Sequence, residues 1–368
     1  MRDLGLALLQ RVRETGDPSL YAQAEEALTR ARDLAPDDAK VLVGIASLQL
    51  GRHRFADALE TADAALAIAP SLPAAHAAKV DALVELGRYD EAADAASELL
   101  ALRVDLSSLA RVSYLRELHG NIDGAVAAMR QAADSPALAP ENAAYVRTLL
   151  GNLLVYASRP DEAASAYQQA VAVVPNHAAA IAGLGRLAVG RGDLDEAISR
   201  FERASAILPL PEYVIALGEA KEASGDSAGA TESYDLARAE TQLFVAGGVD
   251  VDLELALFEA DHGDPATAVE LAEAAYGTRQ TVRTSDALAW AYHKAGRDAD
   301  ASRLSAEALR LGSQDPLLLY HAGVIANASG DTAAARQDLD EAIALDPGFS
   351  ATGAAIARQT LSEIAAAR

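Results

Sequence analysis

The chain has 368 residues, of which 51% are hydrophobic and none is cysteine, and it carries a formal net charge of −23 at pH 7. The absence of cysteine excludes disulfides, thiolate metal sites and cysteine nucleophiles. The acidic excess argues against nucleic acid as a partner, since binding it requires a basic surface, and no apolar run approaches the length of a membrane span.

Alanine supplies 87 residues and aromatic residues only 5%. The helices are therefore expected to form readily and to pack through many thin side chains. Arginine outnumbers lysine 27 to 4, which together with the alanine content suggests a bacterial source. The first residues do not resemble a signal peptide, so the sequence leaves the localisation open: cytoplasmic by default, or extracytoplasmic if a leader has been removed.

Segments with helical periodicity alternate with turns marked by glycine and proline along the whole chain. This alternation predicts one continuous solenoid over residues 1–368, built from ten helix pairs and a last helix. The pairs are expected at residues 2–36, 38–70, 71–103, 106–134, 143–177, 178–210, 211–240, 250–277, 283–313 and 316–347, and the last helix at 350–367.

One small residue in the second helix of each pair marks the repeat. It falls at Ala24, Ala58, Ala92, Ala125, Ala163, Ala197, Ala230, Ala268, Ala301 and Ala335, in steps of 33, 34 or 38 residues. A unit this short cannot bury its own apolar stripe, so it has to stack on its neighbours. The two steps of 38 residues place breaks at 134–141, which contains two prolines, and at 240–249, which contains Gly247 and Gly248.

The unit at 178–210 carries Leu184-Gly185 in its first helix, then Ala197 and Phe201, and ends at Pro209. It resembles the tetratricopeptide repeat, whose pattern is W-x2-L-G-x2-Y followed by A-x3-F, A and P. The usual tryptophan is missing from every copy. The resemblance implies an all-α, right-handed α-solenoid of about ten helix pairs with a C-terminal capping helix.

No sequence motif of an enzyme was found, whether a Walker loop, G-x-S-x-G or H-E-x-x-H. Gly183-Leu184-Gly185 resembles the start of a dinucleotide-binding fingerprint, but it lies within a helix and no strand precedes it. It is therefore interpreted as a helix-packing element. We expect a protein that is not an enzyme, with no catalytic residue, cofactor or metal.

In proteins with this repeat, partners bind to the concave face lined by the first helices. The family's register selects as groove residues Arg111, Asn152, Arg186, Glu219, Glu222, Glu254, Asp286, Trp290, His293, Tyr320 and His321. Family members that clamp a C-terminal carboxylate use lysine and asparagine at fixed places. The lysines are absent here, so a carboxylate clamp is rejected.

Asp286, Trp290 and His293 are spaced to share one face of a helix, and the next first helix brings Tyr320 and His321 close to them. This group is typical of an interface anchor. Two other interpretations remain open, namely a metal site of two histidines and one carboxylate, and a tryptophan packed between repeats.

The sequence thus predicts a non-catalytic scaffold or assembly adaptor that binds a protein or peptide in its concave groove. The groove of repeats 7 and 8 is acidic, which favours a partner with a basic segment. The alternative is a regulatory module that senses a peptide or another ligand, like the pheromone-sensing regulators built on such repeats. The sequence leaves the oligomeric state open.

Overall fold

The computed structural model describes residues 1–137 and 139–366, and within these residues it contains helices and no strand. The first five helix pairs are α1 (Arg2–Thr15) and α2 (Leu20–Leu34), α3 (Ala39–Gly51) and α4 (Phe55–Ile68), α5 (Pro73–Glu85) and α6 (Tyr89–Leu102), α7 (Leu106–Leu118) and α8 (Ile122–Asp134), and α9 (Pro140–Tyr156) and α10 (Pro160–Val173). The next five are α11 (Ala178–Arg191) and α12 (Leu194–Ile207), α13 (Pro211–Ser224) and α14 (Ser227–Ala246), α15 (Asp252–His262) and α16 (Pro265–Thr278), α17 (Val282–Lys294) and α18 (Asp298–Ala308), and α19 (Pro316–Ala328) and α20 (Thr332–Leu345), followed by the single helix α21 (Gly353–Ala366).

The small residues that mark each repeat are buried where the two helices of a pair meet. Their exposed fractions are 0% for Ala24, Ala58, Ala92, Ala125, Ala163, Ala197, Ala268, Ala301 and Ala335, and 3% for Ala230. A methyl side chain at this point lets the two helix backbones approach closely. The repeat therefore depends on alanine here for a steric reason, and a larger residue would separate the pair.

Tyr167 shows how one repeat packs on the next. Its ring is fully buried. A Cβ atom added to Gly151, in the first helix of the same repeat, or to Gly183, in the first helix of the following repeat, would collide with this ring. The two glycines thus form the space that the tyrosine fills, which supports the interpretation of the Gly183 segment as a packing element.

The turns within the pairs follow the usual rules for helix ends. Asp193 accepts a hydrogen bond from the backbone N–H of Glu196 at 3.1 Å, and Asp331 accepts one from Ala334 at 3.0 Å, so each caps the second helix of its repeat. Gly192, which ends α11, has φ of 76°, in the left-handed region where glycine is favoured.

Three helix boundaries differ from those expected. α9 begins at Pro140 instead of residue 143, because proline is well accommodated in the first turn of a helix. α14 continues to Ala246, so the expected end at residue 240 is wrong: Phe244 packs on an apolar cluster of the N-terminal repeats, and the helix ends only at the glycines that follow. α21 starts at Gly353, where Ser350 accepts a hydrogen bond from the Gly353 backbone N–H, while residue 367 of the expected cap lies outside the described residues.

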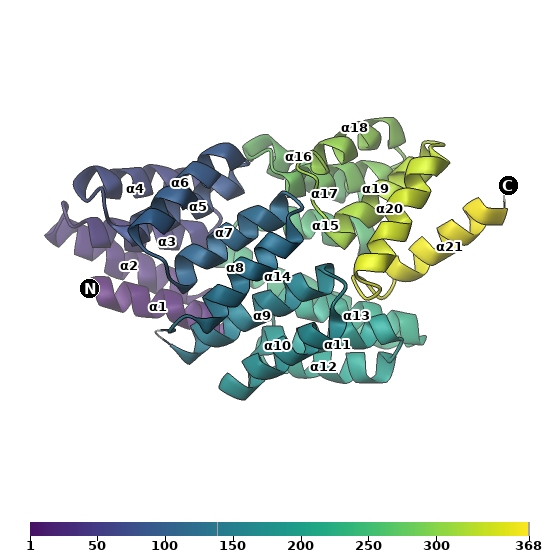
Figure 1. Cartoon of the computed structure of the whole chain (residues 1–368), viewed down its shortest axis with the longest axis horizontal. Coiled ribbons are helices and arrows are strands. Elements are labelled where there is room, and N and C mark those ends of the chain that lie inside the picture. The colour runs from purple at the N-terminus through teal and green to yellow at the C-terminus, as the bar shows by residue number, and fades with distance from the viewer. Residues whose placement is uncertain (138, 367–368) are drawn as a thin grey trace.

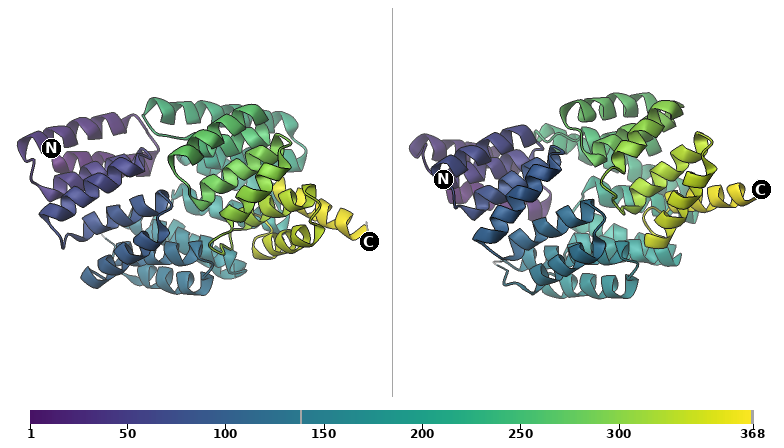
Figure 2. Two further views of the ribbon diagram at one scale, coloured as in Figure 1. Left: turned by 90° about the horizontal axis from the view of Figure 1, so that it is seen from above. Right: turned by 45° about the horizontal axis from the view of Figure 1, so that its top comes forward.

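The helix pairs wind into a superhelix whose termini lie at opposite ends of the long axis (Figure 1). The other views show the chain passing from the N-terminal helices through α9–α14 to α15–α21 around this axis (Figure 2). The all-α superhelical repeat fold predicted from the sequence is confirmed. No helix in the described part of the chain is long and apolar enough to cross a membrane.

Candidate partner-binding surface

Side chains of the first helices line the inner face of the superhelix, and Tyr145 of α9 is the most open aromatic residue among them. It is 53% exposed. The surrounding protein nevertheless raises its pKa, and the carboxylates of Asp81 and Glu212 add to the shift. Because Asp81 lies on α5 and Glu212 on α13, Tyr145 has charged side chains of repeats 3 and 7 near it on the inner face.

A second set of inner side chains, here called the inner cluster, comprises Tyr114, Glu117, Tyr156, Arg283 and Asp315. Arg283 Nη2 lies 3.5 Å from Asp315 Oδ2. Burial raises the pKa of Tyr114 to about 12, and the charge of Asp315, followed by burial, raises that of Tyr156. The inner cluster brings repeats 4 and 5 next to repeats 9 and 10.

The groove residues predicted from the sequence do not include Glu117, Tyr156 or Asp315. Glu117 occupies an inner position of the family's register, so the register alone is sufficient to find it. Tyr156 and Asp315 lie outside those positions, and no sequence pattern marks them. Their proximity results from the winding of the superhelix, which the sequence does not encode in any short motif.

Glu117 predicts a pH-dependent stability. Burial raises its pKa to about 7, with Asp315 adding to the shift and Arg283 opposing it. A glutamate in the unfolded chain titrates near pH ~4.3. Between these two values the folded protein holds a proton that the unfolded chain has lost, so the contribution of Glu117 to stability falls as the pH rises through this window.

The variant Glu117→Gln resembles the protonated state at every pH. We expect its melting temperature to exceed that of the wild type at pH 8, with the difference disappearing at pH 5. The matched control is Glu60→Gln on the exposed surface of α4, which removes an exposed carboxylate. A Glu117→Gln variant with the same relative stability at both pH values would contradict the assignment.

Arg111, predicted as a groove residue, bridges two repeats. Its guanidinium donates to Asp81 Oδ2 at 2.5 Å and to the carbonyl oxygen of Ala77 at 3.2 Å, both on α5, and to Ser107 within its own helix. One quarter of the side chain, 24%, remains exposed. Arg111 thus stabilises the inner face and still presents part of its surface there.

Asn152 and Arg186, the other two groove residues predicted in repeats 4 to 6, have different surroundings. The Asn152 side-chain oxygen accepts a hydrogen bond from the Tyr167 hydroxyl at 2.7 Å, which ties it to the packing between repeats. Arg186 is half-buried, and its charge acts on the inner-face residues Tyr156 and Glu212. Of the two, Arg186 is the one that faces the interior of the superhelix.

The three predicted glutamates of repeats 7 and 8 are not equivalent. Glu219 is 16% exposed at its side chain and accepts a hydrogen bond from the Ser350 hydroxyl at 2.8 Å, so it holds the segment before α21. Glu222 is exposed and accepts from the Tyr234 hydroxyl at 2.7 Å. Glu254 of α15 is also exposed, so only these last two offer an accessible charge.

The group around Trp290 lies in the interior. The exposed fractions are 2% for Trp290, 4% for Asp286, 4% for Tyr320 and 1% for His321. The Trp290 ring stacks on His321 with centroids 4.1 Å apart, and its Nε1 donates to Asp261 at 2.9 Å. The structure therefore corrects the expectation of an exposed anchor, because these aromatic rings fill the space between adjacent first helices.

His321 and His293 do not converge on a common point with Asp286. His321 Nδ1 lies 2.9 Å from Asp286 Oδ2, whereas His293 Nδ1 lies 2.7 Å from Asp298 at the start of α18. Among the described residues no three histidine or acidic side chains are arranged to hold a metal ion. His293 is the most accessible of this set, with 20% of its side chain exposed.

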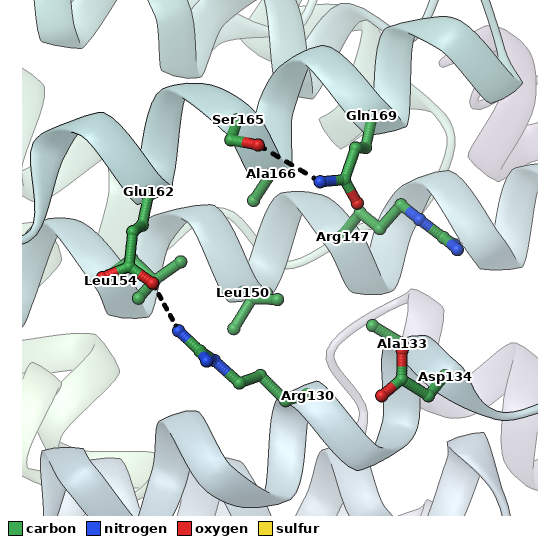
Figure 3. A pocket seen from close by; sticks show the side chains of 10 residues that line it. All are labelled: Arg130, Ala133, Asp134, Arg147, Leu150, Leu154, Glu162, Ser165, Ala166 and Gln169. Carbon is green, nitrogen blue, oxygen red and sulfur yellow. Dashed lines mark hydrogen bonds and ion pairs between the residues drawn. The ribbon is translucent and has the colours of Figure 1, made fainter.

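A hollow of about 320 Å³ lies between α8, α9 and α10 (Figure 3). Arg130 donates to Glu162 at 2.7 Å across its mouth, and Gln169 donates to Ser165 at 3.2 Å. Arg147 donates to the carbonyl oxygen of Ala143 in its own helix. Most polar side chains of this hollow are thus already bonded within the protein, and none of its lining residues is a predicted groove residue.

Comparisons with known proteins agree with the geometry. A model described as tetratricopeptide repeat matches residues 19–73 and 148–209, and another model of the same description matches residues 317–349. A search of curated proteins finds no match.

Among solved structures, the chain is similar to the APC/C hetero-tetramer Cut9–Hcn1, with 18% identity, 94% of this chain and 59% of that chain covered, and a TM-score of 0.41. It is similar to PilF of Pseudomonas aeruginosa, with 18% identity, 57% and 98% covered, and a TM-score of 0.46. A monomeric mutant of IFIT1 with Gppp-AAAA is 15% identical, with 80% of this chain and 68% of that chain covered and a TM-score of 0.51.

Of these three similarities, the one to IFIT1 has a TM-score above 0.5 and supports a shared fold; at 15% identity it shows nothing about partners. The repeat marks, the buried alanines at each helix crossing and the two matching repeat models all describe the same 34-residue unit. The chain therefore contains tetratricopeptide repeats at residues 19–73, 148–209 and 317–349, and the same repeat marks continue between these matches.

Proposed function

We propose that this protein is a non-catalytic scaffold or adaptor that holds a protein or peptide segment against its inner face. Tetratricopeptide repeats generally mediate interactions between proteins. The observation that carries the proposal is the exposure of Tyr145, an aromatic side chain of which 53% is accessible on the inner face. Tyrosine and arginine are enriched in protein interfaces, and Arg111 and Arg186 line the same face.

The partner segment is expected to be basic. The net charge of −23 attracts a cationic partner over a distance, and Glu222 and Glu254 present exposed carboxylates on the first helices of repeats 7 and 8. Glu219, which holds Ser350, is less suited to this role. An interaction of this kind weakens as salt screens the charges.

The test is the double variant Glu222→Lys with Glu254→Lys, measured against partners that the full-length wild type captures from its native lysate. We expect affinity to fall about tenfold, since two attractive pairs worth roughly 0.2–1 kcal/mol each are replaced by repulsion. Affinity of the wild type should also fall between low and physiological salt.

The matched control is Glu232→Lys with Glu270→Lys, which makes the same charge change on exposed positions of the second helices α14 and α16 of the same repeats. This control should bind almost as the wild type does. Equal losses in both double variants would mean that the net charge of the chain matters and the inner face does not.

A further inference from the structure

Successive turns of the superhelix are in direct contact along one line, here called the seam. His53 Nδ1 lies 2.6 Å from the carbonyl oxygen of Asp250, and the Val282 backbone N–H donates to the Tyr89 hydroxyl at 3.0 Å. The Ser158 hydroxyl donates to the carbonyl oxygen of Ala344 at 2.9 Å. These pairs are separated by 197, 193 and 186 residues, which corresponds to between five and six repeats of about 34 residues.

The seam follows a regular rule. Turns between the two helices of repeats 2, 3 and 5 meet loops that follow repeats 7, 8 and 10. The same rule holds at repeat 4, where a Cβ atom on Gly120 would collide with the carbonyl oxygen of Gly312. One edge of the first turn thus docks on the opposite edge of the second turn.

The seam is packed as a core and is not merely a set of surface contacts. Val249 and Val251, which follow α14, are 7% and 9% exposed and belong to one apolar cluster with Leu9 and Leu48 of the first two repeats. The Arg279 guanidinium lies 4.6 Å above the Phe55 ring and donates to Glu85 Oε2 at 2.8 Å. Burial of this kind resists separation of the turns.

Contact between the two turns closes a ring of between five and six repeats, and this changes how a partner reaches the inner face. An open solenoid accepts a folded domain or an internal loop from the side. Where the seam joins the turns, its contacts obstruct this sideways route. Tyr145 on the inner face is 53% exposed, so a segment that enters from the end of the superhelix can contact it.

Building on the proposed function, we propose that the inner face takes an extended peptide segment with a free chain end, which enters along the axis while the seam stays closed. An extended backbone leaves its N–H and C=O groups unpaired, and the tyrosine hydroxyls and guanidiniums of Arg111, Arg186 and Arg283 supply partners for them. The exposed carboxylates of Glu212, Glu222 and Glu254 favour a segment that carries positive charge.

The lack of cysteine in the chain allows a direct test. A single thiol is placed in the lumen by Tyr145→Cys and, as control, on the exposed outer face of α12 by Ser199→Cys. Three maleimide probes are compared on the full chain: N-ethylmaleimide, a linear lysine–alanine peptide with a terminal maleimide, and a small folded protein that carries one maleimide.

The outer thiol should react with all three probes at similar rates. The lumen thiol should react with N-ethylmaleimide and the linear peptide, and at least tenfold more slowly with the folded protein. Adding Tyr89→Phe and Arg279→Gln, which weaken the seam, should remove most of this protection. Equal reaction of the folded probe with the lumen and outer thiols would overturn the proposal, as would a lumen thiol that the linear peptide cannot reach.

Glu212→Cys provides a second lumen position if Tyr145→Cys perturbs folding, which circular dichroism of each variant checks. Size-selective labelling of the lumen together with failure to capture any partner would leave the seam established and reject the scaffold proposal. Capture of a partner by a chain whose lumen thiol reacts with the folded probe would support the scaffold proposal and reject the closed lumen. The two ideas therefore fail separately.

Discussion

Replacing Trp290 with alanine is expected to lower the free energy of unfolding by about 3–5 kcal/mol. The indole is 2% exposed, stacks on His321 and donates its N–H to Asp261 at 2.9 Å. Its removal leaves a cavity between the first helices of repeats 9 and 10 and a histidine without its stacking partner. Denaturant unfolding followed by circular dichroism measures the loss, because the variant has no tryptophan fluorescence.

The control for this experiment is Tyr145→Ala, which truncates an aromatic ring on a helix of the same type but at a 53% exposed position. Exposed substitutions usually change stability by no more than about 0.5 kcal/mol. The proposed function adds a second readout: Tyr145→Ala should weaken partner binding, whereas Trp290→Ala should leave it intact at temperatures where the protein is folded. A Trp290→Ala protein with near-normal stability would show that repeats 9 and 10 pack differently in solution.

Alanine at Gly87 is expected to destabilise the protein more than alanine at Gly296. Both glycines end a first helix with φ of 74°, so both variants lose about 1–2 kcal/mol to the left-handed conformation. A Cβ atom on Gly87 would lie 2.5 Å from the Gln280 carbonyl oxygen across the seam, whereas one on Gly296 meets nothing within 4 Å. The extra loss at Gly87 should be about 1–3 kcal/mol, as in other overpacked sites.

This matched pair separates local strain from contact between turns. Chemical denaturation gives the two stabilities, and small-angle scattering should show a larger radius of gyration for Gly87→Ala alone. Equal stability and equal size for both variants would mean that the seam opens in solution without cost, and it would remove the basis for a closed lumen.

The packing within each repeat and between neighbouring repeats could be predicted from the sequence. The spacing of Ala163 and Ala197 predicts two helix crossings, and both residues are fully buried because a close crossing admits only a small side chain. Tyr167, four residues after Ala163, occupies the F position of the A-x3-F pattern and fills the gap to the next repeat. Each of these predictions depends on contacts within one repeat or between neighbours, where sequence distance is short.

The candidate site was predicted less well, for two physical reasons. Trp290 has the spacing of a groove residue, yet a ring of its size bridges to His321 of the next first helix and becomes part of the core. The inner cluster depends on the pitch of the superhelix. This pitch results from the small rotation between each repeat and the next, summed over between five and six repeats. The extension of α14 to Ala246 contributes to that geometry, and no sequence motif predicts this extension.

The seam also constrains how such a chain can evolve. Linear repeat arrays gain or lose units by duplication and deletion, because each repeat contacts only its neighbours. Here a duplication between repeats 3 and 8 would move Val282 one repeat further along the chain from Tyr89. A different loop would then face the Tyr89 turn, and its side chains would not be complementary to that turn. Closure thus couples the number of repeats to the fold, so the gene is expected to diverge by substitution while its repeat count stays fixed.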